Sequence, residues 1–152
     1  MSSEANTMDP RIPKMIQRHH IFTLATSADN IPYCSTCFYA YDTENNVFIV
    51  TSEKNTRHIA EAAKQYKVAG AIALETKIVG KIRGVQFTGE IKEITGEELK
   101  KYKKTYLNKF PYVAPFIKDT PFWIIQPDFF KLTDNNLGFG KKIIWTKSTD
   151  PQ

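Results

Sequence analysis

The sequence predicts a mainly β fold, a small antiparallel barrel of six to seven strands with peripheral helices. The chain has 152 residues, which suits a single domain. Segments rich in β-branched and aromatic residues recur along it, as strands require. Short polar turns join the first three of these segments, so the strands should pair antiparallel rather than alternate with helices. We expect the domain to cover residues 10–147, between a disordered segment over 1–9 and a tail over 148–152.

The N-terminal third is predicted to contain one short helix and three strands. Pro13 can begin a helix that extends to about His19, because proline is favoured in the first helical turn. Polar turns at 28–30 and 42–46 then separate three strands, which span 21–27, 31–41 and 47–52.

A second helix is predicted directly after the third strand. Asn55 is a good N-cap residue for it. Four residues at helical spacing form one apolar stripe: Ile59, Ala62, Ala63 and Tyr66. The apolar segment 68–75 that follows is expected to be a buried strand.

The C-terminal half has two further periodic segments. Residues 82–94 alternate as a long strand, with Val85, Phe87 and Ile91 on one face and Gln86, Thr88, Glu90 and Lys92 on the other. Thr95 and Glu98 have the spacing of a capping box. The helix that they begin ends at Pro111, and its apolar side carries Leu99, Tyr102, Tyr106 and Phe110. Strands over 121–132 and 141–147, joined by a turn over 134–140, complete the domain.

Charge and targeting signals limit the possible functions. The net charge of +5 suits an anionic ligand or a nucleic acid. The densest run of lysines lies on the polar side of the third helix, where solvent exposure is the simplest interpretation: Lys100, Lys101, Lys103 and Lys104. The N-terminus lacks the apolar segment of a signal peptide, and no run of about 18 apolar residues is present. We therefore expect a cytoplasmic protein.

Cys34 and Cys37 have C-x-x-C spacing but lie inside a predicted strand. Residues i and i+3 of a strand point to opposite faces, so the two sulfurs should diverge. A redox dithiol favours a helix N-terminus, and no second cysteine pair completes a zinc site. We expect two ordinary strand cysteines and no metal.

The segment Thr51–His58 concentrates two cations, hydroxyls and an imidazole where a strand ends and a helix begins. A helix N-terminus offers free N–H groups and the positive end of a dipole, which together favour phosphate. Taken alone, the segment is better explained as a capped helix with solvated Lys and Arg, because helix caps far outnumber anion sites.

Four segments together are more specific than any one alone: CFYAYD, TSEKNTRH, IRGVQFTGEI and TDNNLGFGKKIIW. This set resembles the YhbP-like family of the FMN-binding split-barrel superfamily, to which pyridoxamine-phosphate oxidase also belongs. The resemblance covers about residues 12–147. It implies a split β-barrel that forms a homodimer, with FMN in a groove at the subunit interface.

The same resemblance implies roles for individual residues. The phosphate would be bound by Thr51, Ser52, Lys54, Thr56, Arg57 and His58. The isoalloxazine would lie against Ser35 and Thr36, with Gln86 as a polar contact from the long strand. The partner chain would contribute Phe139, Lys141 and Lys142. The C-terminal Arg/His substrate signature of pyridoxamine-phosphate oxidase is missing, so oxidation of a vitamin B6 phosphate is not expected.

The resulting hypothesis is an FMN-dependent oxidoreductase of unknown substrate. No acid or base can be assigned from the sequence, but a flavin carries its own hydride chemistry and requires few catalytic side chains. A non-catalytic FMN carrier or sensor would need the same site. A basic nucleic-acid-binding barrel is the more remote alternative.

Overall fold

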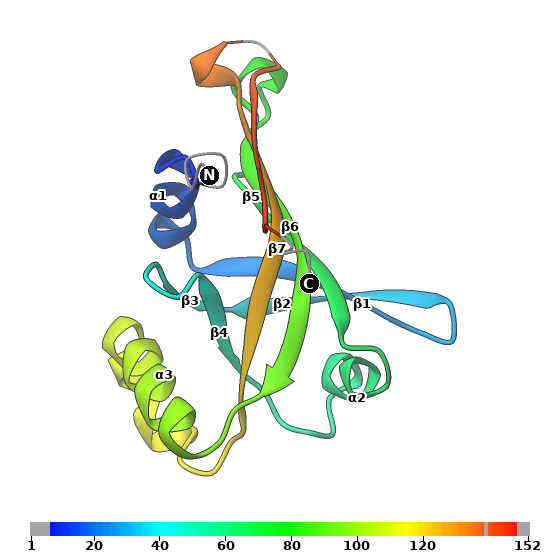
Figure 1. Cartoon of the computed structure of the whole chain (residues 1–152), viewed down its shortest axis with the longest axis vertical. Helices are drawn as coiled ribbons and strands as arrows, with labels where there is room; N and C mark the ends of the chain where they lie inside the picture. The colour runs from blue at the N-terminus through cyan, green and yellow to red at the C-terminus, as the bar shows by residue number, and fades with distance from the viewer. Residues whose placement is uncertain (1–6, 139, 149–152) are drawn as a thin grey trace.

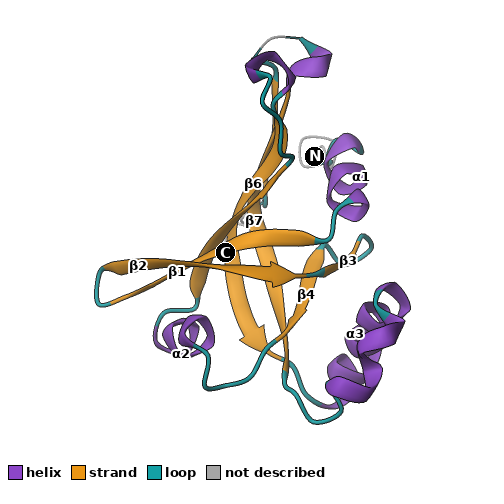
Figure 2. Ribbon diagram, turned by 180° about the vertical axis from the view of Figure 1, so that it is seen from behind, coloured by secondary structure: helices purple, strands orange, loops and turns teal. Residues whose placement is uncertain are grey.

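The computed structural model describes residues 7–138 and 140–148. Its strands form one antiparallel sheet with the order β2-β1-β5-β6-β7-β4-β3, and β8 pairs with β7 (Figures 1 and 2). The strands are β1 (Ile21–Ala28), β2 (Ile31–Phe38), β3 (Ala40–Asp42), β4 (Val47–Thr51), β5 (Lys67–Ala73), β6 (Arg83–Glu93), β7 (Phe122–Asp134) and β8 (Lys142–Thr146). The helices are α1 (Arg11–Arg18), α2 (Arg57–Lys64) and α3 (Gly96–Lys109), with short 3-10 segments η2 (Val79–Lys81), η3 (Pro111–Phe116) and η4 (Asn135–Leu137). The predicted antiparallel β fold with peripheral helices is confirmed.

The described part of the chain has one strand more than predicted, because the segment 31–41 divides at Tyr39. The Tyr39 side chain is fully buried, and its hydroxyl donates to the Ile16 carbonyl at 2.6 Å. The strand before this residue, β2, pairs with β1, and the strand after it, β3, pairs with β4. Burial of one aromatic ring therefore accompanies the break in the strand.

Strands β6 and β7 form the long central ribbon of the sheet. They pair from Arg83 opposite Asp134 to Glu93 opposite Trp123, with a bulge between Thr88 and Gly89. The far end of this ribbon, with η2 and η4 at its tip, extends beyond the rest of the molecule as an arm (Figure 1). The predicted alternation of β6 is confirmed, since Val85 and Phe87 are buried whereas Gln86 is exposed.

An aromatic cluster fills the space enclosed by the sheet. The rings of Phe48 and Phe87 stack with centroids 4.5 Å apart, and those of Phe22 and Tyr39 stack at 5.0 Å. Phe130 closes the cluster from β7. Such rings bury large apolar areas, so this cluster is the main source of the stability of the barrel.

Helix α3 covers the other side of β4 with the predicted apolar face. Its buried residues Tyr102 and Tyr106 pack with Phe110 in a second cluster that includes Val47 and Ile49. Thr95 is the N-cap residue, as the capping-box spacing predicts, but its side chain makes no capping hydrogen bond.

Helix α2 differs from its prediction at both ends. Thr56, not Asn55, is the N-cap residue, and its backbone is extended there. The helix ends at Lys64, so Tyr66 is 52% exposed rather than part of a buried stripe. Ala63 is also exposed, and only Ile59 and Ala62 of the predicted stripe are buried. Where α2 packs against β1, it buries a narrower apolar face than its sequence predicts.

The N-terminal segment is described only in part. Of the predicted disordered residues, 1–6 lie outside the described chain, as do tail residues 149–152. Met8 packs against the core, and Asp9 accepts a hydrogen bond from the Arg11 backbone N–H at 2.9 Å. Within the described residues, the helices are too short or too polar to cross a membrane.

Candidate functional site

The connection from β4 to α2 carries the predicted phosphate-binding residues, and its backbone is anchored to β7. Trp123 donates its indole N–H to the Ser52 carbonyl at 3.1 Å. The Ser52 N–H in turn donates to the Pro121 carbonyl at 3.3 Å. These bonds fix the point at which the chain leaves the sheet and turns into the helix.

Ser52, Thr56 and His58 form a cluster of polar side chains at the start of α2. Ser52 Oγ lies 3.0 Å from His58 Nε2 and 3.4 Å from Thr56 Oγ1. Burial lowers the pKa of His58, which favours the neutral imidazole. Thr56 Oγ1 donates to the Glu53 carbonyl and does not cap the helix. The N–H groups of the first helical turn therefore remain available, as an oxyanion requires.

Arg57 lies at the edge of this cluster, between α2 and β2. Its guanidinium carbon is 4.0 Å from the centroid of the Tyr33 ring, and its Nε is 3.4 Å from Glu61 Oε1. Glu61 also accepts a hydrogen bond from the buried Thr26 hydroxyl at 3.3 Å. The Arg57 side chain remains 56% exposed, so its charge is oriented by two contacts and still accessible to a ligand.

Two members of the predicted phosphate set point elsewhere. Thr51 donates its hydroxyl to the Pro121 carbonyl at 2.8 Å, so this proton is used within the fold. Lys54 Nζ lies 3.5 Å from Glu93 Oε1, and the lysine side chain is 67% exposed. The structure thus brings together Ser52, Thr56 and His58, whereas the adjacent Arg57 side chain contacts Tyr33 and Glu61.

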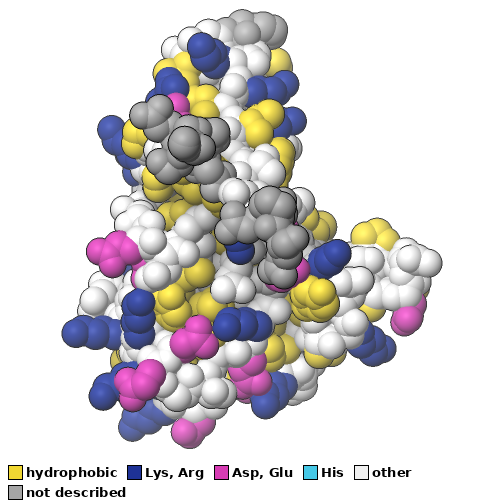
Figure 3. All heavy atoms as spheres, viewed as in Figure 1, with side chains coloured by type: hydrophobic (Ala, Val, Ile, Leu, Met, Phe, Trp, Pro, Cys, Tyr) yellow, Lys and Arg dark blue, Asp and Glu magenta, His cyan; other side chains and the backbone are white. Residues whose placement is uncertain are grey.

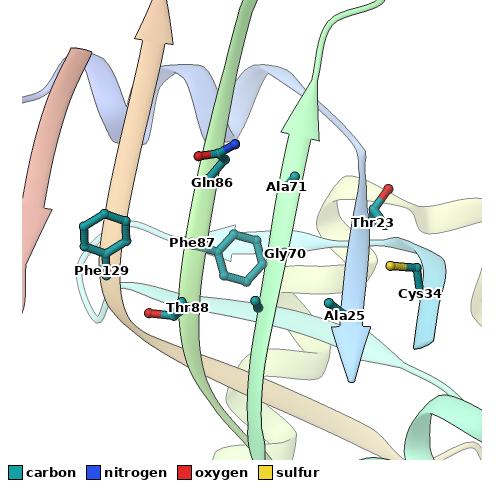
Figure 4. Close-up of a pocket in the computed structure, with 10 residues that line it drawn as sticks. Thr23, Ala25, Cys34, Gly70, Ala71, Gln86, Phe87, Thr88 and Phe129 are labelled. Atoms are coloured by element: carbon teal, nitrogen blue, oxygen red, sulfur yellow. The ribbon is translucent and has the colours of Figure 1, made fainter. Parts of the chain in front are cut away.

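A groove crosses the opposite face of the sheet. We call this the outer face; it carries Thr23 and Ala25 of β1, whereas Phe22, Leu24 and Thr26 lie on the buried inner face. The groove has a volume of about 390 Å³ (Figure 4). It is lined by Thr23, Ala25, Cys34, Ala69, Gly70, Ala71, Gln86, Phe87, Thr88 and Phe129.

The strand register explains how this groove is built. One row of paired residues runs across the sheet as Thr36, Thr23, Ala71, Gln86, Lys131 and Ile144. The neighbouring row runs as Cys34, Ala25, Ala69, Thr88, Phe129 and Thr146. Alanines occupy the middle of both rows, which leaves a shallow floor between longer side chains. Such a floor suits a flat ring system.

A second hollow of about 560 Å³ continues this groove along the strands. The two share Ala25, Ala69 and Thr88. Charged residues line the extension, among them Lys67, Glu90 and Asp128. The outer face therefore combines an apolar floor with a polar end.

The other predicted cofactor residues are divided between the two faces. Ser35 pairs with Leu24 and lies on the inner face, the side on which α2 packs. Thr36 and Gln86 lie on the outer face, in one row. Lys142 pairs with Thr133 at the exposed start of β8. Lys141 precedes β8 and is also exposed, and Phe139 lies outside the described residues. In a single chain, the predicted cofactor residues therefore form two separate groups, one on each face of the sheet.

The sequence predicts a buried strand over 68–75 and therefore misses the groove residues Ala69, Gly70 and Ala71. Val68 and Ile72 are buried, but Ala69 and Ala71 point to the outer face. The available signal was the alanine at every second position of VAGAIA, at Ala69, Ala71 and Ala73.

The two cysteines lie on opposite faces of β2, as the strand periodicity predicts. Cys34 is exposed and lines the groove, whereas Cys37 packs against the core. Burial raises the pKa of the Cys37 thiol. Among the described residues, no cluster of three or more His, Cys, Asp or Glu side chains could bind a metal ion.

Comparison with solved structures defines the class of fold. A heme binding protein from Mycobacterium smegmatis matches 87% of this chain with a TM-score of 0.74 and 17% identity, and the chain spans 55% of that longer protein. HutZ, the heme storage protein from Vibrio cholerae, matches 79% of the chain and 89% of its own at TM-score 0.68 and 16% identity. A FAD-binding protein from Mesorhizobium loti matches 79% of the chain and 87% of its own at TM-score 0.68 and 15% identity. The fold is a split β-barrel, which this chain shares with these three proteins.

Sequence comparison identifies the family within this class, although no protein-family model matches the chain. A UPF0306 protein from Klebsiella pneumoniae is 39% identical over 136 residues, which cover 90% of this chain and 91% of the relative. The UPF0306 protein YhbP of Escherichia fergusonii is 39% identical over 138 residues, covering 91% and 92%. The chain belongs to the UPF0306 (YhbP) family.

Proposed function

We propose that this protein binds FMN as a homodimer, with the phosphate at the start of α2. The observation that carries this proposal is the polar cluster at the helix N-terminus, in which the Ser52 hydroxyl lies 3.4 Å from Thr56 Oγ1 and 3.0 Å from His58 Nε2. Hydroxyl, imidazole and backbone N–H donors converge there beside the guanidinium of Arg57. This donor set fits a phosphate monoester.

Acidic residues near the cluster limit how many phosphate contacts each cation can make. Glu61 pairs with Arg57, and Glu93 pairs with Lys54. Because its planar fork has five N–H donors, Arg57 can bind a phosphate oxygen while Nε remains near Glu61. Lys54 would have to leave Glu93 to reach the ligand. Arg57 is therefore the principal cation of the proposed phosphate site, and Lys54 has a smaller role.

The division of the predicted residues between two faces supports a site shared by two subunits. Gln86 and the alanine floor lie on the outer face, whereas the polar cluster lies on the side of α2. A second copy of the chain would complete the site if its outer groove faced the α2 segment of the first copy. In this arrangement the ring lies against Gln86 of one subunit and the phosphate against Arg57 of the other. Lys141 and Lys142 would then come from the same subunit as Gln86.

We further propose an oxidoreductase of unknown substrate. Bound FMN would supply hydride transfer, and the protein would supply binding, orientation and exclusion of water. The described lining of the groove next to Gln86 carries hydroxyl, thiol and amide groups, which can orient a ring through hydrogen bonds.

The visible spectrum of the freshly purified protein, together with its mass by light scattering, tests the proposal. We expect a yellow dimer that releases FMN on denaturation and bleaches anaerobically with NADH or NADPH. A dimer that contains FMN but resists both reductants would indicate a carrier or sensor. A Soret band would indicate heme instead. A colourless monomer that does not take up added FMN would contradict the proposed site.

A further inference from the structure

A second concentration of positive charge lies away from α2, between α1 and the base of the β6–β7 arm. A cavity of about 150 Å³ is present there. Four cations line it, together with one carboxylate and two apolar side chains: Arg11, Lys14, Arg18, Arg83, Asp134, Met15 and Leu132. Lysine and arginine side chains also gather on the visible surface beside α1 and along the arm (Figure 3).

Helical geometry places three of these cations on one side of α1. Arg11, Lys14 and Arg18 are spaced i, i+3 and i+7, so they lie along a single stripe of the helix surface. Ile12 and Ile16, on the neighbouring stripe, are fully buried and fix the helix against the sheet. The stripe of cations therefore faces Arg83 and Asp134 across a fixed separation.

The carboxylates near this cavity neutralise only part of its charge. Asp9 lies 2.7 Å from Arg11, and Asp134 Oδ1 lies 3.4 Å from Arg83 Nε. Asp134 is only 12% exposed and also accepts a hydrogen bond from the Asn136 N–H at 2.9 Å. Four cations against these two carboxylates leave an excess of two positive charges. The pKa of nearby His19 is lowered mainly by burial, with further contributions from His20, Arg83 and Arg18.

Arg83 also carries a donor that the fold engages only through the long ion pair with Asp134 Oδ1 at 3.4 Å. Its Nε is buried and has no hydrogen-bond partner in the part of the chain that the structure describes. A buried donor without a partner is costly and uncommon in folded proteins. Apart from Asp134, which is paired with Arg83, the polar groups that line the cavity are cationic donors, so an acceptor with several oxygens fits this cavity best.

We propose that this cavity is a binding site for one phosphate group, separate from the proposed flavin site. A phosphate dianion would balance the excess of two charges and accept hydrogen bonds from the arginine forks. The cavity has room for a single phosphate group rather than for a whole nucleotide. Figure 1 shows α1 and α2 on opposite sides of the β6–β7 ribbon, so this cavity is separate from the proposed phosphate site at the start of α2. The ligand is inorganic phosphate or the phosphate of a small monoester.

Calorimetric titration with inorganic phosphate tests this proposal in a background that lacks the principal cation of the flavin site. Arg57→Ala is compared with Arg57→Ala/Arg18→Gln and with Arg57→Ala/Lys14→Gln. We expect Arg57→Ala to bind phosphate and each double variant to bind it about tenfold more weakly, since each loses one charged hydrogen-bond donor. Lys104→Gln, on the exposed face of α3, is the matched control and should leave binding unchanged. Glycerol 3-phosphate, titrated in parallel, shows whether the site also accepts a monoester.

Melting temperatures at matched ionic strength distinguish binding from general screening. Phosphate should raise the melting temperature of Arg57→Ala above the value in chloride, and Arg18→Gln should remove this increment. Without phosphate, Arg18→Gln should not lower the melting temperature, because it relieves repulsion among like charges. Equal effects of phosphate and chloride, or a phosphate affinity that Arg18→Gln and Lys14→Gln leave unchanged, would overturn the proposal.

Discussion

The guanidinium carbon of Arg57 lies 4.0 Å from the centroid of the Tyr33 ring, which connects the first turn of α2 to β2. This contact orients the guanidinium of the residue that precedes His58, a member of the polar cluster in which we propose that the phosphate binds. Arg57→Ala should therefore weaken FMN binding by about ten- to a hundredfold, because a charged hydrogen bond contributes about 1.5–3 kcal/mol. Fluorescence quenching during titration of the apoprotein measures the change.

Riboflavin provides the control for this substitution, since it lacks the phosphate. It should bind the wild-type protein poorly and respond little to Arg57→Ala. Lys101→Ala, on the exposed side of α3, should leave both flavins unaffected. If Arg57→Ala weakens riboflavin as much as FMN, Arg57 supports the fold and does not bind phosphate.

Thr51 should behave as a structural residue, in contrast to its neighbour Ser52. Its hydroxyl donates to the Pro121 carbonyl, so Thr51→Val should lower the free energy of unfolding by about 1 kcal/mol. The ratio of FMN affinity to riboflavin affinity should stay at the wild-type value. Urea denaturation and flavin titration of the same variant measure both quantities. A loss of FMN affinity without a matching loss of riboflavin affinity would indicate that Thr51 does bind the phosphate.

Cys34 and Cys37 should not form an intramolecular disulfide in the folded protein. They lie on opposite faces of β2, with Cys37 packed against the core. Disulfide formation would need the backbone of the strand to move. Mass spectrometry after mild oxidation should detect two thiols in each chain, and Cys34→Ser/Cys37→Ser should retain bound flavin. A disulfide formed by the native protein would contradict the strand geometry.

Lys109 connects α3 to the junction between α1 and the sheet. Its Nζ donates to the His19 carbonyl at 2.6 Å and to the Tyr39 carbonyl at 2.9 Å. Lys109→Met keeps the apolar stem but removes both bonds, so we expect a loss of about 1–2 kcal/mol in the free energy of unfolding. Lys104→Met on the exposed face of the same helix should change it by less than about 0.5 kcal/mol. Equal effects of the two substitutions would contradict the bridging role.

The same lysine should make stability depend on pH. Burial lowers the pKa of Lys109 to about 8, below the value of about 10.4 for an unfolded lysine. Between these values the unfolded state binds more protons, so the contribution of Lys109 to stability rises with pH. Urea denaturation from about pH 8 to about 9 should show this rise as a growing difference in the free energy of unfolding between the wild-type protein and Lys109→Met. The opposite effect of the buried Cys37 thiol is the same in both proteins and cancels in this difference.

Phe48 lies at the centre of the aromatic cluster, in contact with Phe22, Tyr39, Phe87 and Phe130. Its ring also contacts Tyr41 at a centroid distance of 5.2 Å. Phe48→Ala should lower the free energy of unfolding by about 3–5 kcal/mol, because the cavity cannot close against the five surrounding rings. Phe116→Ala is the matched control, since Phe116 is 82% exposed, and should have little effect. Similar values for both would show that the cluster contributes less than its burial indicates.

Elements with strong local periodicity were predicted best from the sequence. The alternation around Val85 and Phe87 defined both faces of β6, and helical spacing placed Tyr102 and Tyr106 on the buried side of α3. These patterns are reliable because one face of each element must leave water. The end of α2 was predicted poorly: Tyr66 fits the helical stripe, but the chain enters β5 before reaching it.

By itself, the sequence determined the antiparallel barrel, the face of each long element and the residue types available for a phosphate. Tertiary structure decided which of them meet. The hydroxyl of Thr51 is used by Pro121, seventy positions away in the chain, whereas that of Ser52 lies beside His58. The outer groove joins Ala25, Ala69 and Thr88 through strand register. Local periodicity reports which face a residue occupies, but register and long-range hydrogen bonds depend on how distant strands pair, so they emerge only in the folded chain.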